Sequence, residues 1–182
     1  MKNERLDGRG GQRRDSDDES EDEGAHVTYR VIQWATGNQG VESIRAMLDR
    51  ADLEVVGAKV YSEAKDGVDV GELAGRPPIG VSATQDVDAL LDLGADCVAY
   101  MPRHASVDEV CAILASGANV TTTAFLFHPR ALPADDLARL EEACRAGGTS
   151  VHGTGLNPGN VSGVLPLALS GMSRTIEKVT LQ

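Results

Sequence analysis

One stretch constrains the fold of this chain more than any other. The apolar run 29–34 passes directly into residues 35–40, which read Ala-Thr-Gly-Asn-Gln-Gly. The segment 39–50 then carries apolar side chains at helical spacing, with polar side chains on its other face. A strand, a small-residue turn and an amphipathic helix together hold the pyrophosphate of a dinucleotide, because a helix N-terminus attracts phosphate.

Strand-like and helix-like segments alternate along the rest of the chain. Strands are expected at 28–34, 53–61, 95–101, 118–122, 149–152 and 177–182. Helices are expected at 39–50, 70–73, 84–93, 107–114, 134–146 and 161–169, with a Ser106–Glu109 capping box before one of them. Apolar strands between helices are typical of a parallel sheet that is covered on both faces. The fold class is therefore α/β, a doubly wound parallel sheet of the Rossmann type.

The turn fills only two of its three glycine slots. In the usual G-x-G-x-x-G pattern, the slots serve the bend, the approach of the pyrophosphate and the packing of helix on strand. Here they hold Ala35, Gly37 and Gly40, so the bend must tolerate a β-carbon. The pattern alone is weak, but its position between a strand and a helix favours nucleotide binding over a merely structural turn.

The end of the second strand bears on the choice between NAD and NADP. An acidic residue about 20 residues after the glycines usually binds the free 2′-hydroxyl of NAD. This chain has Lys59 and Ser62 there, with Glu63 just beyond and Lys65 further on. Without a well-placed carboxylate the pocket can accept a 2′-phosphate. The expected cofactor is NAD(P), with NADP favoured.

Five stretches resemble one family of oxidoreductases. They are 31–40, 69–75, 95–100, 117–122 and 153–159, and the most specific are Trp-x-Thr-Gly-Asn-x-Gly and Thr-Gly-x-Asn-Pro-Gly. Together they resemble the N-terminal domain of the dihydrodipicolinate reductase-like oxidoreductases, nearest to the branch containing 2,4-diaminopentanoate dehydrogenase. The resemblance covers the chain from about Tyr29 onward. It departs from the family at Ala35 and in lacking the family's C-terminal domain.

The resemblance implies a two-domain enzyme that moves a hydride between NAD(P)H and a small imine or amino substrate. The N-terminal domain would hold the nucleotide, and three loops after strands would line its nicotinamide side. The expected cofactor contacts are Thr36, Gly37, Asn38, Gln39, Gly40, Ser62, Met101, Pro102, Arg103, Thr122, Thr123, Asn157, Pro158 and Gly159. The family's acid and anchor residues belong to its C-terminal domain, so no catalytic residue is assigned here.

Three polar residues near strand ends keep alternative interpretations. His104 is either a cofactor contact or an exposed loop histidine. His152 could donate a proton, although a core or hydrogen-bonded structural role is favoured. Asn157 either bonds the nicotinamide carboxamide or simply forms a turn. Histidines and cysteines show no metal-ligand spacing, so no metal is expected.

Composition and charge limit the partners, the domain boundaries and the cellular location expected for the protein. The 182 residues carry a net charge of −11, which disfavours nucleic acid and anionic membranes as partners. Residues 1–27 are expected to form a disordered acidic tail, 28–170 the dinucleotide-binding domain, and 171–182 the start of a truncated C-terminal domain. The sequence shows no signal-peptide pattern or transmembrane-length apolar stretch, and its three unpaired cysteines fit a cytoplasmic protein.

A second class of function competes with the enzyme. The chain could be a non-catalytic NAD(P)-binding or redox-sensing module that meets a partner through its acidic tail or an uncovered face. An apolar face left uncovered would also favour a homo-oligomer.

Overall fold

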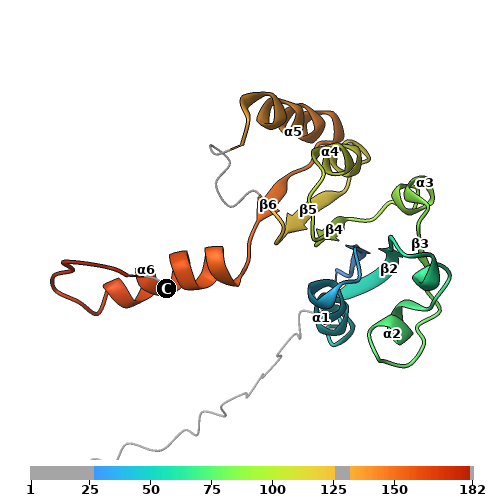
Figure 1. Ribbon diagram of the computed structural model, residues 1–182, viewed down its shortest axis with the longest axis horizontal. Helices are drawn as coiled ribbons and strands as arrows, with labels where there is room; N and C mark the ends of the chain where they lie inside the picture. The colour runs from blue at the N-terminus through green and yellow to red at the C-terminus, as the bar shows by residue number, and fades with distance from the viewer. Residues whose placement is uncertain (1–26, 126–131, 181–182) are drawn as a thin grey trace, which may run out of the picture.

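A computed structural model of the chain describes residues 27–125 and 132–180, and it shows a parallel sheet flanked by helices (Figure 1). The sheet order is β3-β2-β1-β4-β5-β6, and all pairings between neighbours are parallel. The strands are β1 (Tyr29–Trp34), β2 (Leu53–Lys59), β3 (Ala83–Thr84), β4 (Cys97–Tyr100), β5 (Asn119–Thr122) and β6 (Val151–Gly153). The expected doubly wound sheet is confirmed. Residues 1–26 of the expected acidic tail lie outside the described residues.

Helices connect the strands and cover the sheet. They are α1 (Asn38–Leu48), the 3-10 turn η1 (Glu63–Lys65), α2 (Val70–Leu73), α3 (Val87–Leu91), α4 (Val107–Ala115), α5 (Ala134–Gly147), the π-type helix η3 (Leu156–Val164) and α6 (Leu165–Ser170). No helix within 27–125 or 132–180 is long and apolar enough to cross a membrane.

Alternate residues of the central strands enter two separate cores. Val31 and Ala99 pack with α1 and α2 on one face, where Ile44 is fully buried. Ile32 and Tyr100 pack on the other face with α3, α4 and α5. Because side chains alternate along a strand, a strand with a helix layer on each side must be apolar at nearly every position.

Three sequence-based expectations differ from the structure. The expected helix 84–93 is in fact the short strand β3 followed by α3, whose start is capped by Asp86 accepting from the Ala89 N–H at 3.0 Å. The expected helix 161–169 is divided between η3 and α6. The expected strand 177–182 is wrong over its described residues 177–180, which have no regular structure.

The turn after β1 is a close fit between backbone atoms. Ala35 adopts a left-handed conformation (φ 75°), which residues other than glycine rarely take. The buried Gln33 amide donates to the Ala35 carbonyl at 3.0 Å and to that of Ala99 at 3.1 Å. A β-carbon added at Gly40 would overlap the Ala35 carbonyl oxygen. Gly40 is therefore the position at which α1 packs against the end of β1.

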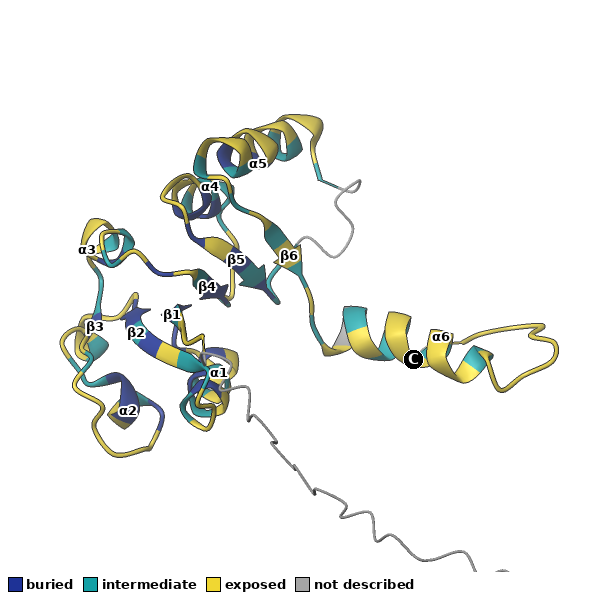
Figure 2. Cartoon of the chain, turned by 180° about the vertical axis from the view of Figure 1, so that it is seen from behind, coloured by how far each residue is buried: buried dark blue, intermediate teal, exposed yellow. Residues whose placement is uncertain are grey.

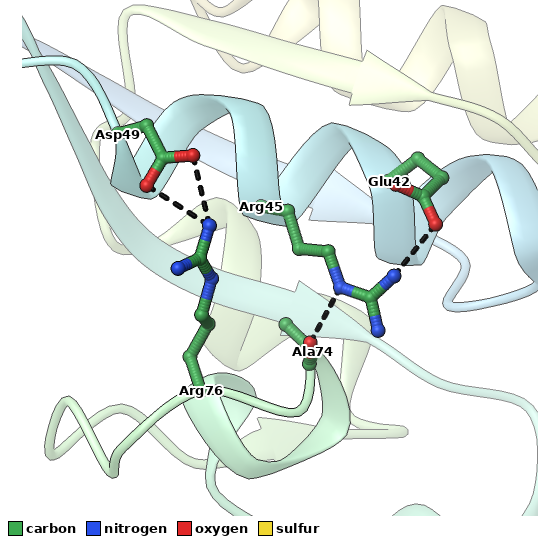
Figure 3. Close-up of polar contacts among 5 residues, drawn as sticks. All are labelled: Glu42, Arg45, Asp49, Ala74 and Arg76. Carbon is green, nitrogen blue, oxygen red and sulfur yellow. Dashed lines mark hydrogen bonds and ion pairs between the residues drawn. The ribbon is translucent and has the colours of Figure 1, made fainter.

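Two arginines tie α1 to the excursion between β2 and β3 (Figure 3). Arg45 Nε donates to the Ala74 carbonyl at 2.7 Å, and Arg76 pairs with Asp49 at 2.8 Å. The Arg45 guanidinium also contacts Glu42 at 2.6 Å. The ion pairs are exposed and contribute little, but the bond to a backbone carbonyl fixes where the excursion lies.

Apolar side chains are exposed in the segment after β6, which projects away from the sheet (Figures 1 and 2). They are Leu156, Val164, Leu165, Leu167, Leu169, Met172, Ile176 and Val179. Large exposed apolar patches mark interaction sites in many proteins. The homo-oligomer expected from the sequence stays a prediction.

Replacing Gly40 with alanine should lower the free energy of unfolding by about 2–3 kcal/mol, because the new methyl group overpacks a backbone carbonyl. The matched control is Gly37→Ala, whose added β-carbon meets nothing within 4 Å. Gly37 has an ordinary φ of −74°, so its replacement should change stability by less than about 1 kcal/mol. Urea denaturation of both variants measures the difference, and equal midpoints would contradict the close fit.

Candidate functional site

A hollow of about 250 Å³ opens at the carboxyl ends of the central strands. We call it the turn hollow, and its lining residues are Ala35, Thr36, Gly37, Tyr61, Ser62, Lys65, Met101 and Arg103. They come from the turn after β1 and from the loops after β2 and β4. β2 and β4 flank β1, and the chain runs outward from β1 through β2 and β3 before it returns to β4 on the other side of β1. The turn hollow thus lies at the topological switch point, where open α/β sheets bind ligands.

The turn hollow is lined by two cationic side chains and no acidic one. Lys65 reaches from η1 to the turn, where its Nζ donates to the Thr36 carbonyl at 2.7 Å and to its hydroxyl at 3.3 Å. Arg103 stands exposed after β4. This distribution of charge suits an anionic ligand.

The backbone at the turn fits a pyrophosphate. Gly37 is the N-cap of α1 and provides no side-chain hydrogen bond to the free N–H groups of the first turn. Because a β-carbon at Gly37 would meet no atom within 4 Å, the glycine leaves open space beside those N–H groups. Open N–H groups at a helix N-terminus are suitable donors to phosphate oxygens.

A second hollow of about 360 Å³ adjoins the first and shares Tyr61 and Arg103 with it. We call it the Glu109 hollow, and its lining residues are Tyr61, Arg103, His104, Ser106 and Glu109. The Tyr61 hydroxyl donates to both carboxylate oxygens of Glu109, each at 3.1 Å. This contact joins the loop after β2 to the start of α4, across the end of β1.

The expected capping box at the start of α4 is only half formed. Ser106 Oγ accepts from the Glu109 N–H at 3.3 Å, as predicted. The Ser106 N–H, however, donates to the Tyr100 hydroxyl at 2.9 Å, and that hydroxyl donates to Glu109 Oε2 at 2.7 Å. A buried tyrosine hydroxyl therefore replaces the carboxylate in the cap and leaves Glu109 in contact with the Glu109 hollow.

Partial burial, followed by the negative charge of Glu109, raises the pKa of Tyr61 from 10 to about 12. A hydrogen bond to Glu109 acts in the same direction, and the indole of Trp34 acts weakly against it. Burial also raises the pKa of Tyr100. Both phenols therefore stay protonated at neutral pH and act as donors to the Glu109 carboxylate.

The structure brings together some of the expected contact residues. Thr36, Gly37, Ser62, Met101 and Arg103 line the turn hollow, and Gly40 packs under it. Asn38 and Gln39 are exposed in the first turn of α1, and Pro102 is buried after β4.

Of the expected nicotinamide-side residues, Met101 and Arg103 line the turn hollow, whereas Thr122, Thr123 and Gly159 line neither hollow. Thr122 is buried at the end of β5, where its hydroxyl accepts from the Ala124 N–H at 3.0 Å, and Thr123 is half-buried. Gly159 lies in η3, where its N–H donates to Ser162 Oγ at 2.9 Å. The side chains of Asn157 and Pro158 lie outside the described part. The assignment of these residues to a nicotinamide pocket stays a prediction.

Lys59, which the sequence places at the end of the second strand, does not line the turn hollow. Its ammonium group is buried, donates to the carbonyls of Val60 at 3.0 Å and Gln85 at 2.9 Å, and lies 4.8 Å from the centre of the Tyr61 ring. Lys65, which the sequence placed beyond the strand end, is the lysine in the turn hollow. Tyr61 and Glu109 were not expected as site residues, since contacts across 48 residues leave no local signal.

The two candidate histidines, His104 and His152, lie in different surroundings. His104 is exposed and lines the Glu109 hollow, which is compatible with both interpretations of it. His152 is exposed on β6, so it is not a core residue, and its hydrogen-bonded structural role stays a prediction. Within the described ranges, no group of three or more His, Cys, Asp or Glu residues could hold a metal ion.

Fold and switch-point hollow together define a Rossmann-type dinucleotide-binding domain. No family model matches the chain. An amine dehydrogenase of Streptomyces virginiae is 34% identical over 161 residues, which are 84% of this chain and 44% of that protein. A 4-hydroxy-tetrahydrodipicolinate reductase of Synechococcus elongatus is 35% identical over 83 residues, 46% of this chain and 29% of that protein.

Solved structures show the same fold. An amine dehydrogenase from Mycobacterium smegmatis superposes with a TM-score of 0.73 at 22% identity, over 84% of this chain and 46% of that one. Biliverdin reductase from Synechocystis, in complex with biliverdin and NADP+, superposes with a TM-score of 0.56 at 20% identity. The superposition covers 79% of this chain and 42% of that one.

The chain is thus a homologue of amine dehydrogenases and dihydrodipicolinate reductases, and the family resemblance is confirmed. It spans less than half the length of these relatives. The assignment to the 2,4-diaminopentanoate dehydrogenase branch stays a prediction.

Tyrosinate absorbance should detect a phenol that ionises near pH 12 in the wild type and is missing in Tyr61→Phe. In Glu109→Gln this phenol should ionise at lower pH, because the neighbouring negative charge is gone. Because the folded pKa lies above the unfolded value of 10, the stability contributed by Tyr61 is present below pH 10 and is lost between pH 10 and 12. An unchanged titration in Glu109→Gln would contradict the contact.

Proposed function

We propose that this chain is the NAD(P)-binding domain of an oxidoreductase that transfers a hydride between nicotinamide and an imine or amino carbon. One observation carries the proposal: the turn hollow combines an open glycine, a free helix N-terminus and two cations at the switch point of the sheet. The names of the homologues, amine dehydrogenase and dihydrodipicolinate reductase, support the substrate class.

The roles of the chain's own residues follow from this geometry. N–H groups at the start of α1 would hold the pyrophosphate, and Gly37 would let it approach. Arg103 would balance its charge, and Lys65 would be available to a 2′-phosphate. The nicotinamide supplies the hydride chemistry when bound, so the domain needs only to bind and orient it. Because the match covers less than half of each relative, we propose that 28–170 is the cofactor domain and that 171–182 leads into a domain contacting the substrate.

Replacing Gly37 with alanine should raise the dissociation constant for NADPH about tenfold, because a methyl group would occupy the space that the pyrophosphate approaches. Calorimetric titration of the chain with NADPH and NADH measures this, and urea denaturation checks that the variant stays folded. If the wild type binds neither nucleotide at millimolar concentration, the proposed function is wrong.

The preference for NADP rests on Lys65. This lysine follows the end of β2 and lines the turn hollow beside Ser62, and no acidic residue lines that hollow. Its present partners are the carbonyl and hydroxyl of Thr36, so its ammonium group can exchange a neutral partner for a phosphate.

Replacing Lys65 with alanine should weaken NADPH binding about tenfold and NADH binding by no more than about twofold, since only NADPH carries the extra phosphate. Arg50→Ala is the matched control: it removes one positive charge from the surface after α1, where Arg50 pairs with Asp52 at 2.5 Å. Equal losses for both nucleotides in Lys65→Ala would refute the preference.

A further inference from the structure

The Glu109 hollow differs from the turn hollow in containing a carboxylate. Its lining includes one carboxylate, that of Glu109, whereas the turn hollow has Lys65 and no acid. The two hollows share Tyr61 and Arg103, so one ligand can occupy both. A ligand that does so must be anionic on one side of Tyr61 and must offer hydrogen-bond donors on the other.

The Glu109 carboxylate keeps unused acceptor capacity. Two hydroxyls, of Tyr61 and Tyr100, supply its donors. Two carboxylate oxygens offer about four acceptor positions and no donor, so at least one further N–H or O–H group can bind. The Tyr100 hydroxyl occupies the place where a capping-box carboxylate would bond the Ser106 N–H. Glu109 is thereby held at the hollow and not folded back on its own helix.

A base suits this hollow better than a phosphate. Phosphate would be repelled by the carboxylate, and Lys65 already provides for it in the turn hollow. The half-exposed Tyr61 ring and the Arg103 guanidinium are flat groups of the kind that stack on nucleobases. Adenine carries an exocyclic amino group, a donor that a carboxylate can bind, whereas an oxo group in its place is an acceptor.

We propose that Glu109 selects the adenine base of the cofactor by accepting a hydrogen bond from its 6-amino group, with Tyr61 and Tyr100 holding the carboxylate in place. This inference rests on the proposed function, because it places the adenine half of the same dinucleotide. It makes Glu109 a specificity residue, and it predicts that a cofactor with hypoxanthine in place of adenine is discriminated against.

The test compares NADPH with reduced nicotinamide hypoxanthine dinucleotide phosphate, which has an oxo group where adenine has the amino group. By calorimetry, the wild-type chain should bind NADPH about tenfold more tightly than the analogue, because the analogue places an acceptor against the carboxylate. In Glu109→Gln the ratio should fall to about one, since a carboxamide can both donate and accept.

Asp108→Asn is the matched control. Asp108 lies next to Glu109, is exposed, pairs with Arg139 on α5 and loses the same charge on substitution. This variant should keep the tenfold ratio. Glu109→Asp, which withdraws the carboxylate by one methylene, is the second variant should Glu109→Gln not fold, and its ratio should fall below that of the wild type.

The outcomes separate the two proposals. Equal affinities of the wild type for both nucleotides would overturn the role of Glu109 and leave the proposed function standing. An unchanged ratio in the folded Glu109 variants, or a reduced ratio in Asp108→Asn, would also overturn it. Absence of binding by the wild type to either nucleotide would overturn both.

Discussion

The rest of the structure depends on how closely α1 approaches the end of β1. The Ala35 carbonyl occupies the space that a side chain at Gly40 would need, and the buried Gln33 amide holds that carbonyl from below. Ala35 itself lies in the left-handed region, at an energetic cost of about 1–2 kcal/mol. Surrounding contacts must compensate for this strain, and the result is a helix whose N-terminus points into the turn hollow.

At the sheet edge, an ammonium group and a carboxylate stand on opposite sides of Tyr61. Lys65 stands on the side of the turn, and Glu109 stands on the side of α4. Between them, the Tyr61 hydroxyl donates to Glu109 and so connects the loop after β2 with α4. An adenine nucleotide has the matching division, because its phosphates are anionic while its base offers a donor. This edge of the sheet can therefore bind the ligand and also fix which end lies beside Lys65 and which beside Glu109.

Local sequence patterns predicted the fold and the turn after β1. They did not predict the part of the site formed by Tyr61 and Glu109. The alternation of strands and helices, the packing role of Gly40 and the helical turn 70–73 could all be inferred from spacing, since each depends on neighbours in sequence. The two-residue β3 carries too few residues to show a period.

Side-chain direction was the harder part to infer. Lys59 and Lys65 are both near the strand end, and only tertiary packing decides that the first is buried against backbone carbonyls while the second reaches Thr36. The contact between Tyr61 and Glu109 joins segments far apart in sequence. The capping box was correct in its serine and wrong in its glutamate, because the competing hydroxyl of Tyr100 lies outside the local motif.

The two outermost strands of the sheet, β3 and β6, limit how another chain can pair with it. β3 has two residues and β6 has three, so the sheet ends on each side with almost no backbone available for pairing. Long open edges invite strand addition and fibril growth, and short ones prevent it. Short edges therefore favour association through side-chain surfaces, such as the exposed apolar residues of η3 and α6. The sheet itself is protected from aggregation by the brevity of its edges.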